Sequence, residues 1–295
     1  MSARPFFIGL GCALAALPLH AQSVNASGQT AAEIEDIGEF VATETETVAP
    51  DGKTVTETVE LRTKFRLTAS TRAQYTSNAI LSGNHGSSDF LFFPTIEGGF
   101  HTEMRHGFSL DVAARIESGL YASNDDRSFV GYGGTVTLDW RPRPMAPRVY
   151  IGMEPYRYDN FDIGGLLTQA IGFTAGIDWG IPFNQGNSAA FVGYNFTHYL
   201  SDPDIDTRNS NKAVVGLVHT FRPQLYGQLF YSFNYDEYTS FDRRDFRHIL
   251  GANVTWQVNR NLFATLSGSF IDNDSDQDHA SYQMAGAALQ LTLQY

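Results

Sequence analysis

In the last eight residues, Ala288 to Tyr295, apolar and polar side chains alternate from Leu289 onward. The large apolar positions carry Leu289, Leu291, Leu293 and Tyr295. A period-two segment that ends on an aromatic residue is typical of a transmembrane β-barrel strand, because one face meets lipid and the other meets the lumen. An edge strand of a soluble β-sandwich is the alternative for this segment alone.

The N-terminus predicts export. Residues 1–21 have the pattern of a secretory signal peptide, with Arg4 before the apolar run Phe6–Leu17 and a cleavage site at Leu19-His20-Ala21. Cys12 is the only cysteine, and it lies inside this signal. We therefore expect a mature chain without disulfides or thiolate metal sites, suited to an oxidising compartment.

Composition excludes two classes of protein. No segment after the signal offers the roughly 20 consecutive apolar residues that a membrane helix needs. The formal net charge is −12 and no run of Lys and Arg occurs, so nucleic acid is not an expected partner. The 14 Tyr and 22 Phe instead suit the aromatic girdles of a membrane barrel.

Residues 22–64 form a separate region, acidic and rich in Thr and Glu. Phe40–Val48 and Thr54–Leu61 could pair across the turn signal Pro50-Asp51-Gly52. Both arms carry Glu and Thr on both faces, so neither could face lipid. We expect a periplasmic extension with little fixed structure beyond one small hairpin. A plug folded into the lumen is the alternative.

Residues 65–295 predict an all-β fold, a transmembrane antiparallel up-and-down β-barrel of about 12 strands. The expected strands, each of a dozen or so residues, are Phe65–Ala79, Asp89–Glu103, Phe108–Tyr121, Phe129–Arg141, Arg148–Tyr158, Thr168–Gly180, Ser188–Ser201, Asn211–Phe221, Leu225–Tyr238, Arg244–Val258, Leu262–Asp272 and Ala280–Tyr295. The even count and the strand length both match a barrel of tilted strands.

The connections and aromatics predict an orientation. Connections after the even strands are short and those after the odd strands are often longer and polar, which places the C-terminus and the extension in the periplasm. The last part of an even strand carries each tryptophan. We therefore expect a membrane-interface belt of Trp140, Trp179, Trp256 and Tyr295.

Residues 65–295 resemble bacterial outer-membrane β-barrel proteins of the β-barrel porin type. The resemblance rests on the terminal strand, the repeated hairpins, and a first hairpin that reads Tyr75-Thr76-Ser77-Asn78, then Ser88-Asp89-Phe90 and Pro94. It implies a location in the cell outer membrane, contact with outer-membrane lipid and lipopolysaccharide, and recognition of the last strand by the outer-membrane assembly machinery. Small-solute or polysaccharide cargo is also implied. No functional residue carries over.

Charges at mid-strand mark the candidate site. Alternation places Arg72, Glu97, Arg115 and Glu117 in the lumen, because a charge on the lipid face at the midplane would cost about 2–4 kcal/mol. They could form a constriction that filters small solutes or a ladder of salt bridges that seals a narrow lumen. Further pore-lining candidates are Asp111, Glu154, Asp178 and Arg66.

The expected function is a porin-like channel for small solutes or a barrel component of an envelope export assembly, with no cofactor and no metal. A lipid hydrolase is the alternative, since His279-Ala280-Ser281 is similar to the His-x-Ser pair of lipid A deacylases. Catalysis would need Ser281 beside a base that a third group orients, and no acid partner is evident. We therefore expect no enzyme activity.

Overall fold

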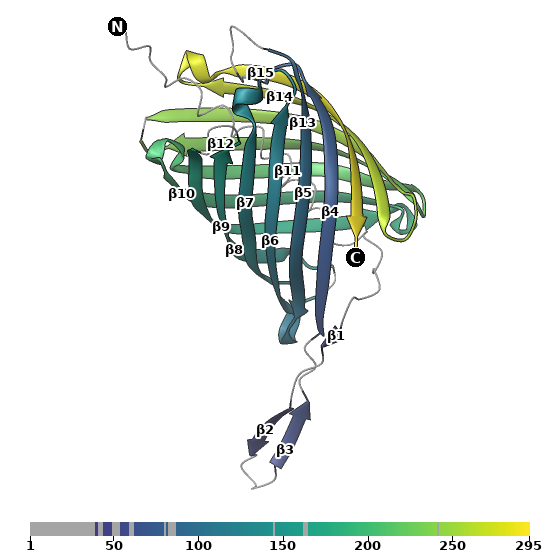
Figure 1. Cartoon of the computed structure of the whole chain (residues 1–295). Helices are drawn as coiled ribbons and strands as arrows, with labels where there is room; N and C mark the ends of the chain where they lie inside the picture. The colour runs from purple at the N-terminus through teal and green to yellow at the C-terminus, as the bar shows by residue number, and fades with distance from the viewer. Residues whose placement is uncertain are drawn as a thin grey trace, which may run out of the picture.

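The protein is a closed antiparallel β-barrel of twelve strands, seen in a computed structural model that describes residues 39–40, 44–48, 54–58, 62–79, 81, 87–143, 145–161, 165–240 and 242–295 (Figure 1). The barrel strands are β4 (Arg62–Thr76), β5 (Asp89–Glu103), β6 (Phe108–Tyr121), β7 (Phe129–Trp140), β8 (Arg148–Asn160), β9 (Leu166–Phe183), β10 (Ser188–Asp202), β11 (Arg208–Arg222), β12 (Leu225–Tyr238), β13 (Arg243–Gln257), β14 (Leu262–Ser275) and β15 (Tyr282–Gln294). Each pairs with its neighbours in the sequence.

The first and last barrel strands close the sheet. β4 pairs with β5 on one side and with β15 on the other, in a register that runs from Thr76 opposite Gly286 to Thr68 opposite Gln294. One step further, Leu67 and Tyr295 exchange two backbone hydrogen bonds of 2.9 Å. The terminal strand is thus the closing strand, and the up-and-down barrel predicted from the sequence is confirmed.

Side chains alternate between the two faces of the wall. The outer face is apolar, and its large side chains remain open to the surroundings, as with Phe90 at 64%, Ile96 at 60% and Leu266 at 62% exposure. The inner face is mostly polar. This partition is the reverse of a water-soluble protein and matches a barrel with lipid outside. In the described part of the chain, no helix is long and apolar enough to span a membrane.

The predicted strands agree with the observed ones to within a few residues, with small corrections at both ends of the barrel. β4 begins at Arg62 and not at Phe65, because its backbone pairs with β5 up to Glu103. β15 begins at Tyr282 and not at Ala280, since Asp278–Ala280 forms the short 3-10 turn η6.

Three short strands precede the barrel. β1 (Glu39–Phe40) pairs with the start of β4, where Glu39 lies opposite Lys64. β2 (Glu44–Val48) and β3 (Thr54–Thr58) form the hairpin that the sequence predicts, and they pair only with each other. The predicted signal peptide, residues 1–21, lies outside the described residues.

We call the end of the barrel that holds Tyr295 the C-terminal rim, and the other end the distal rim. At the C-terminal rim, two tryptophans bind the turns of the chain. The Trp140 indole N–H donates to the carbonyl oxygen of His106 at 3.1 Å, and that of Trp179 to Met145 at 2.9 Å. An aromatic ring on the apolar face with its N–H satisfied by a polar turn is the arrangement expected at a membrane interface.

Two residues of the connection between β4 and β5, Ala79 and Leu81, are buried in the distal half of the barrel. Ala79 is 7% exposed and belongs to an apolar cluster of inward side chains on β5 to β8. Leu81 is 3% exposed and belongs to a second cluster on β13 to β15. Ala79 and Leu81 therefore pack against different parts of the inner wall.

We predict that Leu266→Arg destabilises the barrel by about 2–4 kcal/mol, because the side chain points outward near the middle of β14 and would place a charge in lipid. Ser267→Arg, one residue on and directed into the lumen, is the control and should cost much less. Chemical unfolding in lipid vesicles, followed by tryptophan fluorescence, measures both. Equal losses for the two variants would contradict the assignment of faces.

Candidate functional site: the charged lumen

The inner wall carries its central charge cluster near the middle of β6 and β8. Arg115 lies 3.7 Å from the Glu117 carboxylate and 3.4 Å from that of Glu154. The Tyr158 hydroxyl donates a hydrogen bond of 2.9 Å to Glu117. One guanidinium thus balances two carboxylates, and the tyrosine satisfies one of them further.

Arg72 faces the lumen on β4 but stays apart from this cluster. It is 8% exposed, and no carboxylate lies within 4 Å of it among the described residues. Its guanidinium carbon sits 4.4 Å from the centre of the Phe93 ring. The expectation that all four mid-strand charges come together is therefore only partly met. Arg115 pairs with Glu117, whereas Arg72 stacks on an aromatic ring and Glu97 pairs with Arg66.

A second cluster lies toward the C-terminal rim. Arg66 binds Asp111 at 3.0 Å and Glu97 at 3.3 Å. Further along the wall, Arg148 binds Asp178 at 2.6 Å. The side chains of Glu97, Asp111, Glu154 and Asp178 are all directed inward, as alternation predicts.

A third cluster lies toward the distal rim and was not identified from the sequence. Arg247 pairs with Asp236 at 3.2 Å, and Arg243 pairs with Asp245 at 3.1 Å. Arg208 has no carboxylate within 4 Å in the described part of the chain, and its guanidinium stacks 4.3 Å from the Tyr199 ring. The alternation that located Arg115 also applies to β11, β12 and β13 and could have found these residues.

Lys212 is another luminal cation that the sequence reasoning missed. It lies on the inner face of β11, directly opposite Asn195 on β10 and Asn234 on β12. No ion pair of 4 Å or less holds its ammonium group within the described residues. The inner wall therefore presents both paired and unpaired charges to the lumen.

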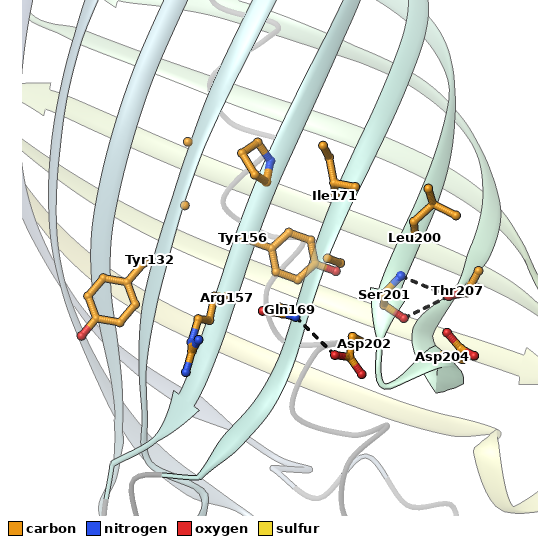
Figure 2. Close-up of a pocket in the computed structure, with 14 residues that line it drawn as sticks. Tyr132, Tyr156, Arg157, Gln169, Ile171, Leu200, Ser201, Asp202, Asp204 and Thr207 are labelled. Atoms are coloured by element: carbon orange, nitrogen blue, oxygen red, sulfur yellow. Dashed lines mark hydrogen bonds between the residues drawn. The ribbon is translucent and has the colours of Figure 1, made fainter.

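A groove of about 710 Å³ lies on the outside of the wall, over β7 to β10 (Figure 2). Outward side chains line it, apolar in one part (Tyr132, Pro155, Ile171 and Leu200) and polar toward the distal rim (Arg157, Gln169, Asp202 and Asp204). Gln169 donates to Asp202 at 3.3 Å. Its lining contains no histidine, so it lacks the usual base of a lipid hydrolase.

The proposed hydrolase residues, His279 and Ser281, also do not form a catalytic pair. The Ser281 hydroxyl accepts a 3.0 Å hydrogen bond from the Ser275 backbone N–H and binds the Ser275 carbonyl, so it stabilises the end of β14. No hydrogen bond joins Ser281 to His279, although both are described. The lipid hydrolase interpretation is therefore not supported. Across the described ranges, no group of three or more His, Cys, Asp or Glu could hold a metal ion.

Comparison with known proteins supports the barrel class. Residues 198–295 match the family described as putative beta-barrel porin 2. No curated protein matches the chain. Together with the closed apolar-faced barrel, the family match confirms the resemblance to porin-type outer-membrane barrels.

Several solved structures are similar in shape. A KdgM porin in complex with disordered oligogalacturonate shares 8% identity at a TM-score of 0.46, covering 77% of this chain and 98% of that one. An anion-selective porin from Comamonas acidovorans shares 9% sequence identity at a TM-score of 0.43, and the match covers 80% of this chain and 100% of that one. The COG4313 outer membrane channel from Pseudomonas putida F1 shares 11% sequence identity at a TM-score of 0.49, and the match covers 78% of this chain and 95% of that one.

We predict that Arg115→Met destabilises the folded barrel by about 1–3 kcal/mol, because it leaves Glu117 and Glu154 without their shared cation. Replacing both carboxylates as well, in Arg115→Met/Glu117→Gln/Glu154→Gln, should restore much of the loss. Chemical unfolding in vesicles is the measurement. A single variant as stable as wild type would show that the cluster contributes nothing to the fold.

Proposed function

We propose that this porin-like outer-membrane barrel is a channel for small polar solutes. The observation that carries the proposal is a lumen lined by polar and charged side chains inside a wall whose outer face is apolar. A barrel of this size holds water-accessible space between its walls unless side chains or loops fill it.

The pattern of ion pairs favours a filter over a seal. The ion pairs among the described residues join positions on the same strand, on neighbouring strands, or two strands apart, as in the pair of Arg115 on β6 with Glu154 on β8; Arg141, which pairs with Asp178 on β9, directly follows β7. These pairs run along the wall and do not bridge the lumen. Charges fixed to the wall of a narrowed passage are what selects ions and small solutes in channels.

Ala79 and Leu81, in the connection between β4 and β5, narrow this passage. Both are buried against the inner wall in the distal half of the barrel, beyond the Arg115 cluster. We place the C-terminal rim and the N-terminal extension in the periplasm and the distal rim outside the cell. This orientation is supported by the tryptophans that bind the turns at the C-terminal rim and by the pairing of β1 with β4 there.

Purified protein should give stepwise conductance in planar lipid bilayers. In a KCl gradient, Glu97→Gln should shift the reversal potential toward anion preference, because it removes a luminal carboxylate that attracts cations. Glu237→Gln is the matched control, since Glu237 faces outward on β12, where it pairs with Arg244 at 3.6 Å. An unchanged reversal potential for Glu97→Gln would mean that this carboxylate does not filter ions.

The same recording tests the rival roles. Membranes that stay sealed with folded protein inserted would favour a structural part in an export assembly over a channel. Recording from a chain that lacks residues 22–64 tests the plug, because a plug predicts larger conductance after its removal.

A further inference from the structure

A small polar cavity lies on the inner wall where β13, β14, β15 and β4 meet. Its volume is about 90 Å³, and Arg72 is the only charged residue in its lining. The other polar side chains in the lining are hydroxyls and amides, those of Gln74, Asn253, Thr265, Ser267, Ser269 and Gln290. No carboxylate in the lining would repel an anion.

The Arg72 guanidinium is buried without an anionic partner. Its face stacks on Phe93, which leaves its N–H edges for a ligand, and its Nε has no hydrogen-bond partner. Glu117 acts on it only through space and is itself engaged by Arg115 and Tyr158. A buried cation of this kind is costly unless an anion joins it, and the planar arginine fork fits a carboxylate with two parallel hydrogen bonds.

The size of the cavity limits what can enter. A water molecule takes a share of about 30 Å³ in the liquid, so the cavity holds about three waters or the end of a larger molecule. Hydroxyl and amide groups around one guanidinium suit a carboxylate that carries hydroxyl groups on the neighbouring carbons. Phe230 lines the cavity and also packs against the apolar cluster that contains Leu81, so the cavity lies beside that cluster.

We propose that this cavity binds the carboxylate end of a hydroxyl-rich acid of the sugar-acid class as it passes through the lumen. The part of the proposal that concerns passage rests on the channel function proposed above. The binding itself depends only on Arg72 and on the polar lining of the cavity.

The test is the binding of D-glucuronate to the detergent-solubilised, folded barrel, measured by isothermal titration calorimetry with D-glucose as the neutral comparison. Wild type should bind glucuronate more tightly than glucose. Arg72→Met should lower the glucuronate affinity about tenfold or more, since it removes a charge-assisted bidentate contact. Its effect on glucose should be small.

Lys212→Met is the matched control, because it removes one unpaired luminal cation away from the cavity. It should leave glucuronate affinity within about twofold of wild type. Ser267→Leu keeps Arg72 but fills the cavity, and it should also abolish tight glucuronate binding. Heat-modifiable mobility on gels confirms that each variant is folded.

Equal glucuronate affinity in wild type and Arg72→Met would overturn the inference, as would an equal loss in Lys212→Met, which would indicate a general luminal field. Failure of the channel function gives a different result. If the barrel binds glucuronate through Arg72 but conducts no ions, the binding site is supported and the channel function is contradicted. If the barrel conducts ions but does not bind glucuronate, the channel function is supported and the binding site is contradicted.

Discussion

Backbone hydrogen bonding in lipid is the constraint on which this structure depends. Inside a bilayer no water is available to satisfy an unpaired N–H or C=O group, so a sheet can span the membrane only if its two edges meet. Here the edges are β4 and β15, which pair along Thr68–Thr76 and Gly286–Gln294. The alternation of the last strand follows from this role, since β15 must present lipid-facing and lumen-facing side chains at the place where the wall is completed.

Closure also determines where charge can be placed. Because the middle of the outer face is apolar, the charged side chains near mid-strand face inward, and neighbouring strands bring opposite charges together along the wall. Arg66, Arg115 and Arg148 each find carboxylates in this way. Outward charges such as Glu237 and Arg157 lie toward the distal rim. Arg72 and Lys212 have no carboxylate within 4 Å among the described residues. Unpaired cations of this kind are what an anion-binding lumen needs, whereas a lumen sealed by salt bridges would have none.

The sequence predicts the wall well because a strand's faces depend on a local period of two. All twelve strands were located, and the inward placement of Glu97 and Glu117 required no tertiary information. Pairing between particular side chains was harder to predict, because it depends on register and on the rotamers of long side chains. The stacking of Arg72 on Phe93 and the burial of Leu81 against β13 to β15 depend on contacts between different strands, which no local pattern encodes.

The third cluster, toward the distal rim, shows another limit of prediction from sequence. Arg208, Arg243 and Arg247 occupy inward positions that the alternation along β11 and β13 identifies. The pairing of Arg247 with Asp236 depends on the register between β12 and β13, whereas Arg243 and Asp245 lie two residues apart on one strand. For this fold, inward position can be predicted from sequence, whereas the partner of an inward charge requires the structure.

The most direct test of the account is a disulfide across the seam. Ser70 and Thr292 face each other between hydrogen-bonded pairs of β4 and β15, where Cα atoms lie about 4.5 Å apart, close enough for a disulfide. In the mature chain, Ser70→Cys/Thr292→Cys should cross-link nearly completely in the folded barrel, seen as a reductant-sensitive shift on denaturing gels, while Ser70→Cys/Leu291→Cys should not. No cross-link in the first pair, or equal cross-linking in both, would contradict the closed barrel.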